Sequence, residues 1–397
     1  MKVLSIGGGG GMGRTTARTA PGFPFVEEIV LAGIDHERAD RFARSLNDPR
    51  IRAIYLDITD ENALRQAIRQ CDVVLNSAGP FFRFGLPVLR AAIAEGKNYC
   101  DICDDWEPTL DMLALDEEAR RQGVTAVIGL GASPGIANLL AVKAAEQLDE
   151  VHELYSAWRL SNAHNEDDGF FDENEANTDA AAVHLVHCLS EKIPLVRDGR
   201  VEDRLPLEHC GFDYPGVGKL DIWTIGHPEA VTLPRHYTGL RNCLNGMLGV
   251  ETIIDDLHQL ADHVRAGAMS LEQAAALLTS DGGREKRRQR LQEHEGPGAP
   301  GILAFAGGLK DGRPARAGAR LRHVPSGGMS AVTGIPHALF LPLLHQGAVK
   351  GSGVFSPRAG NRCRCLLRLV EWLRRRAGLR PDRDIRPLTP ATGGRAA

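Results

Sequence analysis

Short apolar runs alternate with amphipathic stretches through the first third of the chain. Each apolar run has the length of a buried strand, and the stretches between them place apolar residues at helical spacing. We expect strands at Lys2–Ile6, Ile29–Ile34, Arg52–Leu56, Val73–Ser77, Asn98–Ile102 and Thr125–Ile128. The helices expected between them are Met12–Thr19, Arg38–Leu46, Glu61–Gln70 with Asp60 as N-cap, Leu86–Glu95 and Pro108–Gln122. This alternation predicts an α/β fold, a Rossmann-type doubly wound parallel sheet covered by helices on both faces.

The pattern changes beyond about Val151 to longer and less regular strands, which predicts a second, α+β domain for substrate binding and dimerisation. A length of 397 residues also exceeds the size at which one core usually stops growing. We place the Rossmann domain at residues 1–135 and the second domain at 136–330. The second domain should contain a helix over Leu257–Leu278, in which Ser270 and Gln273 resemble a capping box. Residues 357–397, rich in Arg, Pro and Gly, are expected to be a poorly ordered tail.

A glycine run directly follows the first predicted strand and precedes the first predicted helix. It contains Gly8-x-Gly10-x-x-Gly13, in which the first glycine allows a tight turn, the second a close approach of a pyrophosphate, and the third close helix–strand packing. A phosphate would lie at the N-terminus of the helix, beside Gly11, Met12 and Arg14. The position of the run in a βαβ unit therefore predicts a dinucleotide site rather than a flexible loop.

Ligands of parallel sheets bind beyond the carboxyl ends of the strands, and small, polar or kinked loops follow five of the predicted strands. The predicted cofactor contacts in these loops are Asp35, Arg38, Asp57, Ile58, Asn76, Ser77, Ala78, Gly79, Pro80, Gly131, Ser133 and Pro134. Gly33 stands where an NAD-binding acidic residue would end the second strand, which leaves room for a 2′-phosphate paired with Arg14 or Arg38. We therefore favour NADP over NAD.

Composition narrows the class of protein. A net charge of −4 and a pI near 6.4 argue against a nucleic-acid-binding surface. The first apolar run is interrupted by glycines, and the long apolar stretch Val124–Val142 contains Gly, Ser and Pro, so we expect a cytoplasmic protein without a membrane span. Cys100-x-x-Cys103 has no second Cys or His pair at zinc spacing, and Cys363-Arg-Cys365 is only weak evidence for a metal, so we expect no metal.

Five motifs together resemble the saccharopine dehydrogenase family, in particular its glutamate-forming saccharopine reductase branch. They are Gly8–Gly13, Asn76-Ser-Ala-Gly-Pro80, Gly96-Lys-Asn-Tyr-Cys-Asp101, Gly131-Ala-Ser-Pro-Gly135-Ile-Ala-Asn138 and Thr333-Gly-Ile-Pro336. The resemblance spans residues 1 to about 355. It implies an NAD(P)-dependent oxidoreductase that acts on a C–N bond between amino-acid-like halves, with residues 331–356 folding back onto the first domain and the active site in the interdomain cleft. We expect a homodimer with a small amino-acid-like substrate.

Hydride transfer to an imine needs a carboxylate anchor and a group that manages one amine proton. The titratable candidates are Asp101, Cys103, Asp104, His227 and Glu229, and Arg235 is the preferred carboxylate partner, ahead of Arg159. We expect the substrate between the Cys103–Asp105 loop and the turn at His227–Glu229. Each of these residues could instead be structural, because an Asp after a strand commonly caps a helix and a His-Pro-Glu turn commonly fixes a loop.

One departure from the family pattern concerns the substrate. The resemblance implies an arginine early in the helix around Asp179–Leu189, where this chain has alanines followed by His184 and His187. This argues against saccharopine itself. Two other functions stay open. One is a trans-acting enoyl-reductase-like C=C reductase, although Ser133-Pro-Gly135 followed by Asn138 favours the saccharopine reductase type. The other is a non-catalytic dinucleotide sensor.

Overall fold

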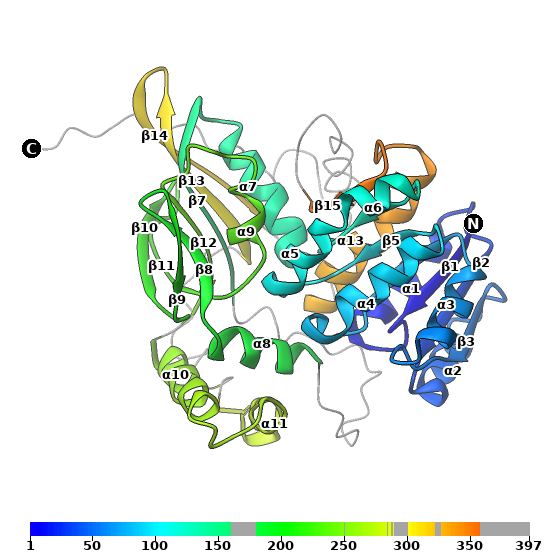
Figure 1. The fold of residues 1–397 in the computed structure, drawn as a ribbon. Helices are drawn as coiled ribbons and strands as arrows, with labels where there is room; N and C mark the ends of the chain where they lie inside the picture. Colours follow the sequence, from blue (N-terminus) through cyan, green and yellow to red (C-terminus); the bar gives the residue numbers. More distant parts are fainter. Residues whose placement is uncertain are drawn as a thin grey trace, which may run out of the picture. The chain divides into compact units, whose positions relative to one another are not determined.

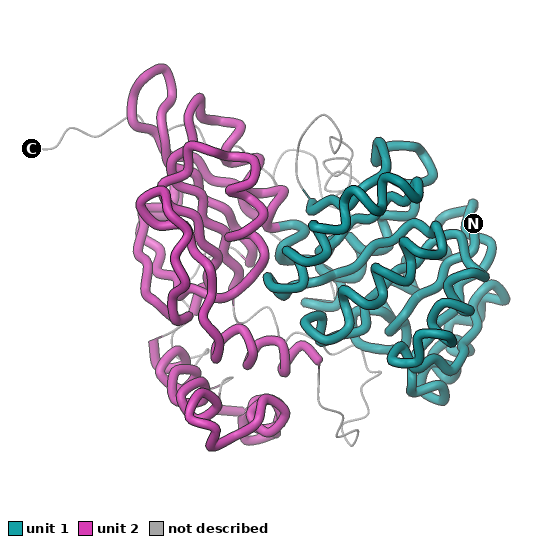
Figure 2. The backbone as a smooth tube through the Cα atoms, viewed as in Figure 1, with its two compact units in different colours: residues 1–136, 325–378 teal, residues 137–324, 379–397 magenta. Residues whose placement is uncertain are grey.

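The computed structural model describes residues 1–159, 180–249, 251–283, 285, 286, 289, 301–321 and 327–357. These residues form two compact units, coloured separately in Figure 2. Unit 1 comprises residues 1–136 together with the described part of 325–378, and unit 2 takes up the chain between them, 137–324. Nearly all of the expected C-terminal tail, including Cys363 and Cys365, lies outside the described residues.

Unit 1 is built on a seven-stranded sheet in which all the strand pairs are parallel (Figure 1). The strand order is β15-β6-β5-β4-β1-β2-β3, so the chain reverses its direction of travel at β1. Such a reversal opens a crevice beyond the carboxyl end of the strand, where ligands of doubly wound sheets bind. The strands are β1 (Lys2–Ile6), β2 (Glu28–Gly33), β3 (Ile51–Tyr55), β4 (Val73–Asn76), β5 (Asn98–Asp101), β6 (Thr125–Val127) and β15 (Gly353–Phe355).

The helices of unit 1 follow the sequence pattern with two differences. The helix expected to begin at Leu86 begins at Phe81, because Phe81 is buried in the core and the amide of Phe82 is satisfied by the Asp105 carboxylate at 2.8 Å. The single helix expected over Pro108–Gln122 is divided at Leu115 into two. The helices are α1 (Gly11–Thr19), α2 (His36–Ser45), α3 (Glu61–Arg69), α4 (Phe81–Ala94), α5 (Trp106–Ala114), α6 (Asp116–Arg121) and α13 (Gly328–His345).

Helix α13 returns to unit 1 after the chain has passed through unit 2. It packs against α1 so closely that a Cβ on Gly334 would lie 2.6 Å from the Met12 carbonyl oxygen. The Thr16 hydroxyl donates to the Gly334 carbonyl at 3.1 Å across this contact. The chain then adds β15 to the edge of the sheet beside β6. The C-terminal segment thereby holds the helix that follows the glycine run.

Unit 2 is a mixed eight-stranded sheet with helices (Figure 1). The path β10-β11-β12-β7-β13-β14 is antiparallel except at the parallel pair of β12 and β7, and β8 and β9 extend it from β12. The strands are β7 (Glu150–Arg159), β8 (Ile193–Arg197), β9 (Arg200–Arg204), β10 (His209–Tyr214), β11 (Gly218–Thr224), β12 (Asn242–Leu248), β13 (Ile302–Lys310) and β14 (Arg313–Leu321). The helices are α7 (Ala137–Ala145), α8 (Ala180–Ser190), α9 (Glu229–Thr232), α10 (Glu251–Arg265) and α11 (Leu271–Thr279).

The predicted helix Leu257–Leu278 is wrong as one element. It is two helices, α10 and α11, separated by a turn in which Gly267 has a φ of +70°, a conformation that favours glycine. The predicted capping box is confirmed: Gln273 N donates to Ser270 Oγ at 3.1 Å, and Ser270 N donates to the Gln273 side chain at 2.9 Å. The cap signal therefore marks a true helix start within a stretch whose apolar spacing predicts one continuous helix.

Candidate functional site

The glycine turn lies between the carboxyl end of β1 and the N-terminus of α1. Gly13 has no room for a side chain, since its Cβ would lie 2.2 Å from the Gly7 carbonyl oxygen and 2.7 Å from Ser77 Oγ. A Cβ on Gly8 would lie 2.8 Å from Ser5 Oγ. These two glycines are required by the packing of strand, turn and helix.

Gly10 is different, because a Cβ there would meet only the Gly7 carbonyl oxygen, at 3.2 Å. It is the N-cap of α1, where no side chain caps the helix and the first turn carries no acidic residue. The first-turn amides and the positive end of the helix dipole are therefore suited to an anion. Gly11 and Met12 belong to the same turn, which fits the pyrophosphate of a dinucleotide.

The end of β2 has the space that a 2′-phosphate needs. No atom lies within 4 Å of a Cβ built on Gly33, whereas Asp35 caps α2 by accepting from the Arg38 amide at 3.0 Å. Arg38 lies in the first turn of α2, and its side chain is half-buried. Arg14 is fully buried, with its guanidinium carbon 5.9 Å from the centre of the Phe42 ring. Of the two predicted phosphate partners, Arg38 is thus the more accessible.

The other predicted cofactor loops are ordered by their own hydrogen bonds. The Asp57 carboxylate accepts from the amide and hydroxyl of Thr59, which lowers its pKa, and Ile58 lies between them in the chain. After β4, Asn76 Oδ1 accepts from the Ala78 amide at 3.0 Å, and Ser77 Oγ donates to the Ile6 carbonyl at 3.0 Å. Gly79 and Pro80 then lead into α4.

Asp101 lies at the end of β5 in a closed network. Its carboxylate accepts from the Tyr99 hydroxyl at 2.9 Å and from the amides of Cys103 at 3.0 Å and Gly129 at 2.6 Å. Asn76 Nδ2 donates to the same Tyr99 hydroxyl at 3.1 Å. Asp101 is fully buried, and burial raises its pKa to about 6 despite these donors. The network ties the loops after β4, β5 and β6 together.

The loop after β5 places its three candidate residues differently. Cys103 is fully buried, and burial together with nearby carboxylates raises the pKa of its thiol well above the usual range. Asp104 is half-buried and Asp105 is buried at the start of α5. A thiol with a raised pKa is poorly suited to proton transfer near neutral pH. Asp104 is consequently the most accessible titratable group of this loop.

The turn after β6 packs against the returning helix α13. A Cβ on Gly131 would lie 3.0 Å from Thr333 Cγ2, and Ser133, which is half-buried, and Pro134, which is buried, belong to a distorted helical turn at Ala132–Ile136. Two motifs separated by about two hundred residues in the sequence therefore meet in unit 1. The sequence predicted the Gly131–Gly135 turn near the cofactor and the return of residues 331–356 to the first domain, but it had no signal for the contact between the two motifs.

His337 is a buried residue of α13 that sequence reasoning missed. Its Nδ1 lies 3.3 Å from Thr16 Oγ1 and its Nε2 lies 3.1 Å from the Cys100 carbonyl oxygen. Because a carbonyl only accepts, Nε2 carries the proton of the neutral ring, and Nδ1 is an acceptor beside the Thr16 hydroxyl, whose one proton is shared between Nδ1 and the Gly334 carbonyl. Burial lowers the pKa of His337 to about 4. The neutral ring thus joins α13 to α1 and β5, behind the glycine turn.

Asp101 and His337 predict opposite effects of pH on stability. Because the pKa of Asp101 is raised, the folded state holds more protons than the unfolded state between about pH 4 and 6, and this contribution to the free energy of unfolding falls as pH rises. Because the pKa of His337 is lowered, its contribution rises with pH over a similar window. The measured quantity is the free energy of unfolding at about pH 6.5 minus that at about pH 4. We expect this difference to be up to ~3 kcal/mol more positive in Asp101→Asn than in the parent, and more negative by a similar amount in His337→Gln. Urea unfolding at both pH values measures this, and shifts of the same sign in both variants would contradict it.

The candidate residues of unit 2 lie around α9. His227 is buried just before this helix, its ring centre 5.7 Å from that of Trp158. Glu229 is fully buried, and the pKa of the buried Cys243 thiol is raised by burial and by the charge of Glu229. Arg235 follows α9 with an exposed side chain and has no ion-pair partner among the described residues, whereas Arg159 is half-buried. Arg235 is therefore available to a carboxylate.

Two residues that were not predicted adjoin His227. His184 Nε2 on α8 lies 3.1 Å from His227 Nε2, and Cys188, one turn later on the same helix, lies against the His184 ring. The i, i+4 spacing of His184 and Cys188 was the available sequence signal, because it places both side chains on one face of a helix.

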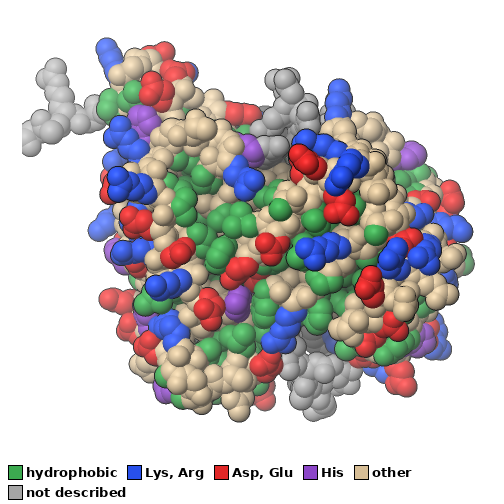
Figure 3. All heavy atoms as spheres, viewed as in Figure 1, with side chains coloured by type: hydrophobic (Ala, Val, Ile, Leu, Met, Phe, Trp, Pro, Cys, Tyr) green, Lys and Arg blue, Asp and Glu red, His purple; other side chains and the backbone are tan. Residues whose placement is uncertain are grey.

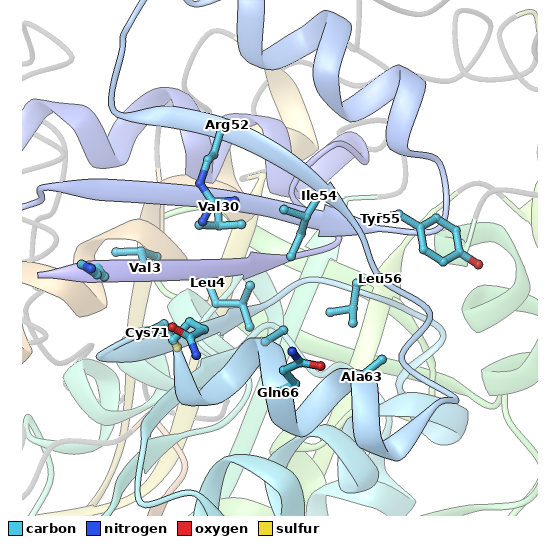
Figure 4. A pocket seen from close by; sticks show the side chains of 13 residues that line it. Val3, Leu4, Val30, Arg52, Ile54, Tyr55, Leu56, Ala63, Gln66 and Cys71 are labelled. Carbon is cyan, nitrogen blue, oxygen red and sulfur yellow. The ribbon is translucent and has the colours of Figure 1, made fainter.

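A cavity of about 330 Å³ in unit 1 lies away from the glycine turn (Figure 4). It lies between α3 and the sheet, lined by Leu4, Val30 and Ile54 from neighbouring strands, and reaches Lys2 at the start of β1. The glycine turn follows the opposite end of β1. This cavity is consequently separate from the predicted cofactor site.

On the face shown in Figure 3, Lys and Arg side chains are interspersed with Asp and Glu side chains. No helix among the described segments combines the length and the apolar character needed to cross a membrane.

Comparisons with known proteins agree with this geometry. The family model described as the saccharopine dehydrogenase NADP-binding domain matches residues 3–127. The chain is 23% identical to a carboxyaminopropylagmatine dehydrogenase of Synechocystis sp. over 90% of this chain and 92% of the relative. It is 31% identical to an NADP⁺-dependent, L-glutamate-forming saccharopine dehydrogenase of Schizosaccharomyces pombe, over 30% of this chain and 25% of that one.

Among solved structures, the apo L-glutamate-forming saccharopine dehydrogenase of Saccharomyces cerevisiae matches with a TM-score of 0.65. The match covers 97% of this chain and 99% of the other at 17% identity, which shows a shared fold. The predicted α/β architecture with a second mixed-sheet domain is confirmed.

Proposed function

We propose that the chain is a member of the saccharopine dehydrogenase family, an NADP-dependent oxidoreductase that transfers a hydride to or from a C–N bond of an amino-acid-derived substrate. The observation that carries this proposal is the glycine turn. Its packing glycines, its open Gly10 and the uncapped first turn of α1 form a pyrophosphate cradle within the domain that matches the family.

In this proposal the chain's residues first bind and orient the cofactor. The turn from Gly8 to Gly13 holds the pyrophosphate. The open space at Gly33 accommodates the 2′-phosphate, and we assign Arg38 as its partner. The loops that begin at Asn76 and Gly131 border the nicotinamide. Bound NADP supplies or accepts the hydride. The Asp101 network keeps these loops at fixed positions, which hydride transfer requires.

The substrate's charged groups require partners of defined chemistry. We assign the carboxylate to Arg235, whose planar guanidinium suits a bidentate pair and whose side chain is exposed. His227, Glu229 and Asp104 are the candidates for the amine proton, since an imidazole or a carboxylate can accept one proton and return it. These assignments extend the sequence predictions.

The proposed function is tested by oxidation of secondary-amine substrates with NADP⁺. Purified full-length protein is mixed with carboxyaminopropylagmatine or saccharopine, the substrates that name the two relatives, and absorbance at the reduced nicotinamide band is followed. The missing helix arginine predicts turnover of the first compound in preference to saccharopine. Reduction of an activated C=C substrate without C–N activity would support the enoyl-reductase alternative instead. Tight NADPH binding with no turnover across a panel of amines and keto acids would favour a sensor.

Cofactor preference gives a separate prediction at Gly33. Gly33→Asp should raise the Kd for NADPH at least about tenfold, or ~1.4 kcal/mol, because a carboxylate in this open space repels a 2′-phosphate. NADH, which has a hydroxyl there, should bind no more weakly than before. Gly33→Ala adds bulk without charge and is the control. Equal losses for both cofactors in the aspartate variant would place the 2′-phosphate elsewhere.

Two further properties belong to this proposal. A cytoplasmic location is supported by the six described cysteines, whose thiols are not joined in disulfides and so suit a reducing compartment. A homodimer is supported by Val201 and Leu205, 71% and 48% exposed, at the edge hairpin of unit 2.

A further inference from the structure

Three potential metal ligands converge inside unit 2. His184 and Cys188 come from one face of α8, and His227 comes from the turn before α9. All three side chains are buried, and their ligand atoms lie within 4.8 Å of one another. Groups of this type in the interior either satisfy one another by hydrogen bonds or share a cation.

The distances resemble those between ligands of a tetrahedral ion. With metal–nitrogen bonds of about 2.0–2.1 Å, two nitrogens on a tetrahedral zinc lie about 3.3 Å apart, and a nitrogen and a sulfur about 3.6 Å apart. The two Nε2 atoms are 3.1 Å apart, and Cys188 Sγ is 3.7 Å from His184 Nε2. The histidines therefore already have the spacing of a ligand pair.

The sulfur needs a small rearrangement to join them. Cys188 Sγ lies 3.6 Å from Nδ1 of His184 as well, and its thiol is placed to donate to the Gly226 carbonyl at 3.2 Å. The ligand atoms of the three residues all lie within 4.8 Å of one another, so a short movement of the sulfur is enough to bring it to the histidine pair. The thiol would then lose its proton to solvent, because the thiolate is the ligand, so one proton is released for each metal bound.

We propose that His184, Cys188 and His227 form a binding site for one divalent transition-metal ion, of the zinc type. Two imidazoles and one thiolate favour Zn²⁺ or Co²⁺ over the hard cations Mg²⁺ and Ca²⁺, which take oxygen ligands. The inference does not rest on the proposed oxidoreductase activity. It does exclude His227 as the group that handles the amine proton whenever the metal is bound, because an Nε2 atom that coordinates a metal cannot also carry a proton.

The test is metal binding by the full-length protein in the absence of cofactor and substrate. Protein stripped with a chelator is titrated with Co²⁺ and followed by absorbance. We expect one equivalent to produce intense visible bands of tetrahedral cobalt together with a near-ultraviolet sulfur-to-cobalt band. Stoichiometric Zn²⁺ should displace the bound cobalt. Added instead to the stripped protein, Zn²⁺ should release one proton and raise the Tm, whereas Mg²⁺ should do none of these.

Matched variants assign the signal to this cluster. Cys188→Ser should remove the sulfur-to-cobalt band and lower Zn²⁺ affinity more than about 100-fold, and His184→Gln should weaken binding comparably. Cys210→Ser and His209→Asn change a thiol and an imidazole elsewhere in unit 2 and should keep the full signal. Circular dichroism of each stripped variant establishes folding, and either ligand variant suffices if the other does not fold. The proposal would be overturned if the folded wild type gave no cobalt bands, or if the sulfur-to-cobalt band survived in Cys188→Ser.

Discussion

Gly10→Val is expected to lower the affinity for NADPH by at least about 100-fold, or ~2.7 kcal/mol, in a protein that still folds. Gly10 is the N-cap of α1, beside the first-turn amides that we assign to the pyrophosphate. A valine side chain would occupy the space through which the phosphate approaches, while its Cβ meets only one protein atom, at 3.2 Å. Fluorescence titration with NADPH measures the loss.

Two companion variants separate binding from folding at this turn. Gly10→Ala should weaken NADPH binding less than valine does, because it adds one methyl group. Gly13→Ala should instead lower the Tm, since its Cβ would lie 2.2 Å from the Gly7 carbonyl oxygen. If folded Gly10→Val bound NADPH as tightly as the parent, the glycine turn would not be the phosphate site.

Arg235→Lys is expected to lower kcat/KM by on the order of 2–4 kcal/mol, roughly 30- to 900-fold, without weakening NADPH binding. The exposed guanidinium is assigned to the substrate carboxylate, and lysine keeps the charge but lacks the planar pair of donors. Steady-state kinetics on the substrate identified by the amine screen, with NADPH titration in parallel, measure both quantities.

Arg241→Lys is the matched control, because Arg241 is another exposed arginine of unit 2. It should leave both quantities unchanged. Unchanged kinetics in Arg235→Lys, or a defect limited to NADPH binding, would exclude Arg235 as the carboxylate partner. The role would then pass to Arg159, the second arginine considered for the substrate.

Local sequence signals determined the elements of unit 1 closely. The first predicted strand, Lys2–Ile6, has the observed bounds, and Asp60 accepts from the amides of Asn62 and Ala63 as the predicted N-cap. Apolar runs, helix caps and glycine turns depend on residues within a few positions of one another, so they can be read without knowledge of the fold. The glycine turn and its place in the sheet were predictable for the same reason.

Contacts between residues distant in the sequence needed the tertiary structure. His337 meets Thr16 across 321 positions, and His184 meets His227 across 43. Arg14 follows the glycine turn in the sequence, but packing against Phe42 buries it away from solvent. A side chain's burial and partners depend on which surfaces the chain brings together, and no local pattern carries that information. The sequence by itself thus determined the dinucleotide turn and the class of fold, whereas tertiary packing decided which buried histidines, carboxylates and thiols meet.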